Sequence, residues 1–72
     1  MDEIKEIRIT TDYITLGQFL KFASLIGNGA EAKFFLAENP AIVDGEEESR
    51  RGRKLRGGEI VEIGEKKFRI TK

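Results

Sequence analysis

The sequence predicts an α+β domain: two short packed helices on a small, mostly antiparallel sheet, in the order β-α-α-β-β-β-β. Three observations predict this class. Apolar and polar residues alternate near both ends of the chain, as they do in strands. Two stretches before Pro40 space their apolar residues as a helix does. Asp44-Gly45 is a strong signal for a tight hairpin. With 72 residues, the chain has room for a single domain, residues 1–72, and one modest core.

The first strand and the first helix are expected before residue 28. Ile7 and Ile9 alternate with charged and polar neighbours, which is the period of a half-buried strand. Thr15 has the position of a helix N-cap, because Gln18 three residues later completes a capping box. The apolar face that follows at helical spacing consists of Leu16, Phe19, Leu20 and Ala23. We expect residues 27–29, Gly-Asn-Gly, to end this helix, since glycine accepts a left-handed conformation at little cost.

A second helix is expected to start at once. Asn28 is a good N-cap, and the charge of Glu31 suits the positive end of the helix dipole. The buried face of this helix should consist of Ala32, Phe35 and Leu36. Pro40 ends the helix, because the residue before a proline is pushed out of the helical region.

Phe22 and Phe34 fall outside the two predicted apolar faces. We expect both rings to belong to the periphery of the core. The alternative is that they are stacking platforms for unpaired bases.

The rest of the chain predicts four strands. Ile42-Val43 is a short strand, and the Asp44-Gly45 turn leads into residues 46–49, whose charged side chains suit the edge of a sheet. Gly57-Gly58 predicts a turn rather than an activated terminus, because further residues follow it. The last two strands should form a hairpin that turns near Gly64-Glu65, and they comprise Ile60, Val61, Ile63 and residues 67–70.

The charge of the chain is concentrated in one place, residues 50–56, which we call the basic segment. The chain has 13 basic and 13 acidic residues, and 5 of the basic ones stand in this segment. The remainder is therefore acidic. A guanidinium-rich segment on an otherwise acidic small domain predicts a surface for polyanions, with phosphate backbones as the leading candidate.

Leu55 is the only apolar residue of the basic segment, and we expect it to anchor the segment in the core. The flanking arginines would then point in fixed directions, and their planar forks suit phosphate groups and stacking on bases. The alternative is a solvated loop that keeps the protein in solution. The residues expected to contact phosphates are Arg50, Arg51, Arg53, Lys54 and Arg56, with Lys21 and Lys33 extending the patch across the helices.

Composition excludes several kinds of chemistry. The chain has no cysteine and no histidine, which removes disulfides, thiolate zinc sites and imidazole bases. Residues 46–48 are three glutamates in a row, but successive strand residues point to opposite faces and cannot converge on one metal ion. No pair of acids stands in an evident pocket. We expect no enzyme activity, no metal or other cofactor, and no small-molecule substrate.

The start of the chain, residues 1–6, is acidic and lacks the features of a signal peptide. Apolar runs are also far shorter than the roughly 20 residues that span a bilayer. We therefore expect a cytoplasmic protein that does not associate with membranes.

Several stretches together resemble the RNA-binding domain named after protein four of the small ribosomal subunit, the S4 domain or αL motif. Residues 28–32 stand where that family has Ser-Arg-x-x-Ala, Val43-Asp44-Gly45 where it has Val-Asn-Gly, and residues 55–61 where it has Val-x-x-Gly-Asp-x-Ile. The likeness covers roughly residues 14–64. Within the family, the chain is most similar to the stand-alone bacterial YaaA-like proteins.

The resemblance implies a protein that binds structured RNA, ribosomal RNA in particular, with a role in ribosome assembly. In three places the chain departs from the family pattern. Gly29 replaces an arginine, which removes a phosphate contact that Lys33 could partly replace. Asp44 replaces an asparagine and adds a negative charge, and Glu59 replaces an aspartate.

Two other functions remain open from the sequence. The first is a protein–protein adaptor that docks its basic segment on an acidic partner. The second is a DNA-binding protein, because phosphate recognition alone does not separate the two polymers. The oligomeric state is also left open.

Overall fold

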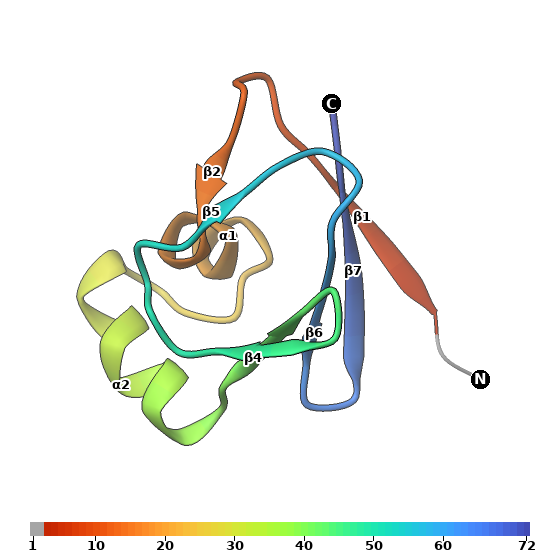
Figure 1. The fold of residues 1–72 in the computed structure, drawn as a ribbon. Helices are drawn as coiled ribbons and strands as arrows, with labels where there is room; N and C mark the ends of the chain where they lie inside the picture. Colours follow the sequence, from red (N-terminus) through yellow and green to blue (C-terminus); the bar gives the residue numbers. More distant parts are fainter. Residues whose placement is uncertain (1–2) are drawn as a thin grey trace.

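The computed structural model describes residues 3–72, so the first two residues of the acidic N-terminus lie outside it. Its elements in chain order are β1 (Ile4–Arg8), β2 (Ile14–Thr15), α1 (Leu16–Phe22), the 3-10 turn η1 (Gly29–Glu31), α2 (Ala32–Glu38), β3 (Ala41–Val43), β4 (Glu46–Glu48), β5 (Lys54–Leu55), β6 (Ile60–Ile63) and β7 (Lys66–Thr71). The helices gather on one side of the molecule and the long strands on the other (Figure 1). The α+β class is confirmed.

The main sheet has five strands in the order β1-β7-β6-β3-β4. All neighbouring strands are antiparallel except β1 and β7, which are parallel. Strand β4 lies at the edge, as its three glutamates predict. The turn at residues 64–65 joins β6 to β7, also as expected.

The predicted element order lacks β2 and β5, which form a separate two-stranded sheet. Ile14 pairs with Leu55 and Thr15 pairs with Lys54. Each strand is only two residues long, so neither shows the period-two pattern that identifies a strand in a sequence. What the sequence predicts as a loop is therefore partly a strand.

The start of α1 is confirmed and its end is not. The Thr15 N–H donates to Gln18 Oε1 at 2.9 Å, and the Gln18 N–H donates to Thr15 Oγ1 at 3.2 Å. The helix ends at Phe22, before the expected residues 27–29. Ser24 takes the left-handed conformation instead, with a φ of 60°. Its N–H donates to Lys21 O and the next N–H donates to the carbonyl of residue 20, the two bonds of a Schellman motif.

Asn28 is the N-cap of the second helical segment, as predicted. Its Oδ1 accepts a hydrogen bond from the Ala30 N–H at 2.9 Å. The first turn is a 3-10 turn, and the α-helix begins only at Ala32. Ala32 and Leu36 are buried as expected, whereas Phe35 is half-buried.

The predicted hairpin between β3 and β4 is present. Asp44 and Gly45 both have positive φ, 49° and 89°, which is the requirement of a type I′ turn. Asp44 also joins this hairpin to β6, because its Oδ1 accepts a hydrogen bond from the Ile60 N–H at 2.9 Å. The carboxylate thus supports the sheet, in the same way as an asparagine side-chain oxygen could.

One core holds the two sides of the molecule together. The rings of Phe19 in α1 and Phe68 in β7 meet edge to face, with their centroids 5.1 Å apart. Leu55 is fully buried in the same core, which confirms the predicted anchor of the basic segment. The expectation for Phe22 and Phe34 was wrong: they are 59% and 73% exposed and do not belong to the core.

Within residues 3–72, no helix has both the length and the apolar content that crossing a membrane would require.

Candidate nucleic-acid interface

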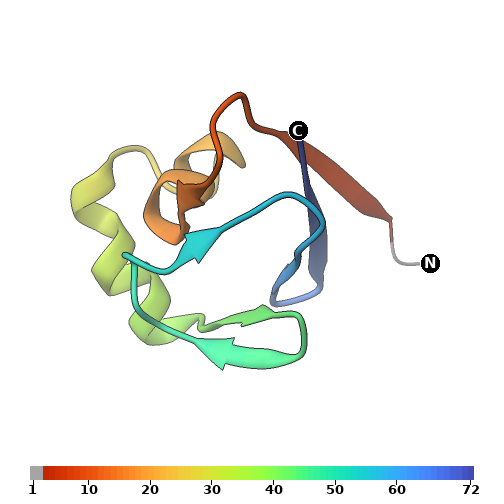
Figure 2. The same cartoon turned by 45° about the horizontal axis from the view of Figure 1, so that its top comes forward.

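The basic segment is fixed beside the start of α1 by main-chain hydrogen bonds. The Leu16 N–H donates to Arg53 O at 2.8 Å, and the Gly17 N–H donates to Arg51 O at 2.9 Å. These two N–H groups belong to the first turn of the helix, where no partner exists within the helix itself. Figures 1 and 2 both show the segment, in turquoise, running from β4 past α1 into β5.

Gly17 is the point where the segment, α1 and α2 come together. A Cβ placed at Gly17 would lie 3.5 Å from the Cβ of Arg51 and 3.6 Å from the Cβ of Ala32. These are ordinary packing distances, so Arg51 packs against α1 at Gly17, next to the point where Ala32 of α2 meets the same glycine. The segment is therefore a packed part of the domain.

Two of the five cations are paired with carboxylates of the protein. The Arg50 Nε and Nη2 atoms each donate to one oxygen of Glu48, both at 3.0 Å. The Arg53 Nη2 atom donates to Glu59 Oε2 at 3.1 Å. These two arginines differ in exposure, since 81% of the Arg50 side chain is accessible but only 29% of the Arg53 side chain.

Glu48 is the centre of the first of these contacts. Its Oε2 also accepts hydrogen bonds from the N–H groups of Ser49 and Arg50, at 3.1 and 3.0 Å. The Arg50 side chain and these N–H groups lower the pKa of Glu48 from 4.5 to about 2. Within the described residues, Glu48 is the glutamate of β4 that pairs with Arg50 and, at 3.9 Å, with Arg53.

Glu59 holds the second contact, which sequence reasoning missed. One of its oxygens accepts from the Arg53 guanidinium and the other from the Arg56 N–H. Both ends of β5 are thus tied to one side chain. The signal in the sequence was an acid placed just after the basic segment and the Gly57-Gly58 turn, where it can fold back on the segment.

Arg51, Lys54 and Arg56 are exposed and have no ion-pair partner in the described part of the chain. Two of them lie over the ring of Tyr13: Lys54 Nζ is 5.0 Å and Arg56 Cζ is 5.8 Å from its centroid. Such contacts at exposed sites are weak, about 0.5–1 kcal/mol, and leave the N–H donors available. These three residues present the unneutralised charge of the segment.

Two shallow depressions follow the segment. One, of about 480 Å³, is lined by the segment itself, including Arg50, Arg53, Lys54 and Arg56. The other, of about 380 Å³, lies between the segment and the helices, and its lining includes Arg51, Lys21 and Gly29.

The structure thus brings Lys21 of α1 next to the basic segment, as the sequence predicts. Gly29, which stands where the family pattern has an arginine, borders the same depression. Lys33 is exposed in the first turn of α2 but does not line either depression.

Comparison with known proteins gives two matches. The model of the S4 domain matches residues 7–71. A protein of Bacillus subtilis (strain 168), named "Probable ribosome maturation protein RlbA", is 54% identical over 57 residues, which are 79% of this chain and 80% of that protein. The S4 domain match includes both the basic segment and the helix pair.

Proposed function

We propose that this chain, which belongs to the S4 domain family, is a non-enzymatic protein that binds structured RNA. The resemblance drawn from the sequence is confirmed. The name of the Bacillus subtilis relative supports ribosomal RNA as the target and ribosome maturation as the process. A cytoplasmic location follows from this proposal.

The single observation that carries this proposal is the rigid basic segment beside the helix pair. Arg51, Lys54 and Arg56 have side-chain donors that no described residue accepts from, and main-chain hydrogen bonds hold their backbone in place. Little conformational entropy is then lost when phosphates bind. Recognition should rest on charge and shape, because A-form RNA hides its base edges in a deep, narrow groove.

The remaining basic residues predicted to contact RNA have different roles. Arg50 is exposed and extends the surface with the donors that Glu48 leaves unused. Arg53 is half-buried, and its main contribution is to hold the segment in its conformation. Lys21 borders the depression that contains Arg51, and Lys33 extends the positive surface along α2.

A charge-removal experiment tests the proposal. We expect the triple variant Arg51→Gln, Lys54→Gln, Arg56→Gln to bind a hairpin of ribosomal RNA at least about tenfold more weakly, since phosphates that no longer meet a cation keep their counterions. The protein should stay folded with only a small fall in melting temperature, because these side chains are exposed, form no ion pairs with described residues and lose only the weak contacts of Lys54 and Arg56 with the Tyr13 ring. Binding is measured by fluorescence anisotropy and unfolding by circular dichroism.

The matched control removes three cations elsewhere, with Lys5→Gln, Lys66→Gln and Lys67→Gln. These lysines line one depression on the main sheet together with the carboxylates of Glu3 and Glu65. We expect the control to keep nearly all of the RNA affinity. An equal loss of RNA affinity in both variants would mean that only the net charge of the protein matters, and it would contradict the proposed surface.

The adaptor and DNA-binding alternatives predict different competitors. Duplex DNA at the same salt concentration should displace the RNA hairpin only weakly. Displacement by an acidic protein together with no binding of the hairpin would support the adaptor instead.

A further inference from the structure

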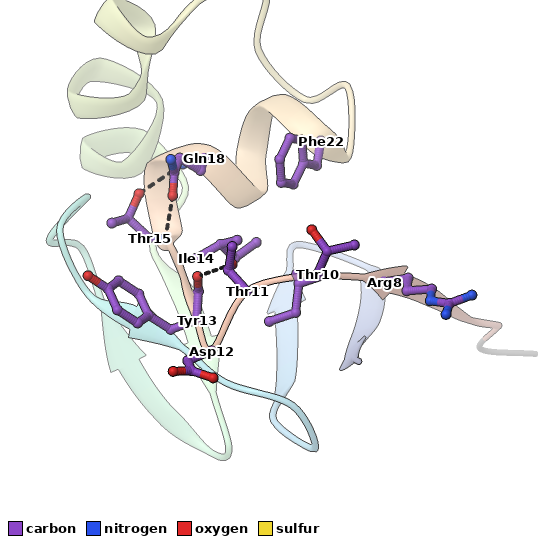
Figure 3. Close-up of a pocket in the computed structure, with 10 residues that line it drawn as sticks. Arg8, Thr10, Thr11, Asp12, Tyr13, Ile14, Thr15, Gln18 and Phe22 are labelled. Atoms are coloured by element: carbon purple, nitrogen blue, oxygen red, sulfur yellow. Dashed lines mark hydrogen bonds between the residues drawn. The ribbon is translucent and has the colours of Figure 1, made fainter.

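A separate depression of about 660 Å³ lies between α1 and the connection from β1 to β2 (Figure 3). Its lining combines two exposed aromatic residues, Tyr13 and Phe22, with hydroxyl, amide, guanidinium and carboxylate groups. The lining includes Arg8, Thr10, Thr11, Gln18 and Phe22. None of them belongs to the basic segment, and the comparisons above assign no role to them.

Phe22 supplies a flat apolar face to this depression. Its ring projects from the end of α1 toward the β1–β2 connection (Figure 3), and the residue is 59% exposed. Burial in the core would stabilise the protein more than this position does. An exposed aromatic face beside polar groups is the usual platform on which proteins stack an unpaired base.

The polar groups around the ring have unused hydrogen-bonding capacity. Gln18 Oε1 accepts from the Thr15 N–H, which leaves both N–H donors of the Gln18 side chain available. The Thr11 hydroxyl donates to Tyr13 O at 2.7 Å and keeps its acceptor capacity. The edge of a base needs both donors and acceptors, and this wall of the depression offers both.

Arg8 adds a cation at one end of the depression (Figure 3). It has no ion-pair partner among residues 3–72. The acidic member of the lining, Asp12, turns its carboxylate away from Phe22 in Figure 3 and lies 3.4 Å from Lys72 Nζ. The Asp12 carboxylate thus does not face the Phe22 ring, and the Arg8 cation is not neutralised by a described carboxylate.

The depression is continuous with the surface proposed to bind RNA. Thr15 and Gln18 line both this depression and the one that contains Lys21 and Arg51. On its other side, Tyr13 belongs to the lining while its ring lies under Lys54 and Arg56. An RNA strand on the basic segment can thus continue into the depression without leaving the protein surface.

We propose that this depression binds one unpaired nucleotide of the RNA, with its base stacked on Phe22. Gln18 and Thr11 contact the edge of the base, and Arg8 contacts an adjacent phosphate. This inference rests on the proposed function, and it adds that the target carries an unpaired base next to its helical part.

The test compares two hairpins with the same backbone, one with normal loop nucleotides and one with abasic loop nucleotides. We expect Phe22→Leu to weaken binding of the normal hairpin by roughly tenfold, because stacking on the ring is abolished. It should leave binding of the abasic hairpin unchanged. Phe22→Tyr keeps an aromatic face and should keep the affinity.

The matched control is Phe34→Leu, because Phe34 is also an exposed ring on a helix but lies outside the depression. We expect no change with either hairpin. No effect of Phe22→Leu on the normal hairpin, or an equal loss with both hairpins, would overturn the nucleotide site.

The same binding measurements show whether the nucleotide site alone is wrong or whether the protein does not bind RNA at all. If the Arg51, Lys54 and Arg56 triple variant loses affinity while Phe22→Leu does not, the nucleotide site is wrong and the basic segment still binds RNA. If the wild-type protein binds neither hairpin, both proposals are wrong.

Discussion

At the scale of single residues, arginine has two distinct uses in the basic segment. Arg53 donates to Glu59 and lies mostly covered, so it supports the local structure. Arg51 packs through its backbone and Cβ and leaves its guanidinium open. The same side chain suits both purposes because its five donors form a planar fork that fits a carboxylate as well as a phosphate.

The ion pair between Glu48 and Arg50 makes the stability of the folded protein depend on pH. Its pKa is lowered from 4.5 to about 2 in the folded protein, so its ionised form is favoured by folding. The stabilisation is fully present above a pH of about 4.5 and is lost as the pH falls toward 2. We expect Glu48→Gln to lower the melting temperature at neutral pH, with a difference from wild type that shrinks across this window.

Thermal unfolding followed by circular dichroism over this pH range measures the difference. Glu47→Gln is the matched control, because Glu47 is an exposed neighbour on the same strand without an ion pair among the described residues. A Glu48→Gln difference that stays constant down to the lowest pH would contradict the importance of its charge.

Single residues were predictable from the sequence where their chemistry acts locally. The Thr15 cap and the Asp44-Gly45 turn depend on neighbours a few residues away, and both were predicted correctly. The exposure of Phe22 was not predictable, since it depends on where the β1–β2 connection lies in space. The bond from Arg53 to Glu59 likewise requires the chain to fold back around β5.

At the scale of elements, the β2–β5 pair turns a charged loop into a positioned surface. Leu55 anchors the pair in the core. The carbonyl groups of Arg51 and Arg53 accept hydrogen bonds from N–H groups at the start of α1. Sequence periodicity could not reveal this pair, because each strand contributes only two residues. The end of α1 was also missed, since Ser24 takes a conformation usually filled by glycine.

The contacts of Arg53 with Glu59 and Glu48 predict that this arginine stabilises the folded domain. We expect Arg53→Ala to destabilise the domain by about 1 kcal/mol, since Glu59 loses a charged hydrogen-bond donor and Glu48 loses a more distant ion-pair partner. For a domain of this size, that corresponds to a fall of roughly 4–8 °C in melting temperature. Differential scanning calorimetry measures the change.

Arg51→Ala is the comparison for this experiment, because it removes an equal charge from the same segment without breaking an ion pair. Its melting temperature should match that of the wild type. A stable Arg53→Ala variant with strongly reduced RNA affinity would show instead that Arg53 contacts the RNA directly.

At the scale of the whole molecule, the net charge is zero but the positive charge is concentrated on one segment. The chain carries 13 basic and 13 acidic residues, yet five basic residues gather on one segment beside the two helices. Local concentration of charge guides a polyanion to one face of the molecule even when the net charge is zero. This feature was visible in the sequence, whereas the fold was required to show which of the five cations are paired with carboxylates and which are not.

The dependence of RNA affinity on salt tests this account most directly. The logarithm of the association constant should fall linearly with the logarithm of salt concentration, by about 0.7 for each phosphate neutralised on a single strand and about 0.9 on a duplex. We therefore predict that the Arg51→Gln, Lys54→Gln, Arg56→Gln variant has a slope shallower than the wild-type slope by roughly 2 to 3. An unchanged slope, or wild-type binding that does not depend on salt, would contradict the claim that the basic segment holds the RNA backbone.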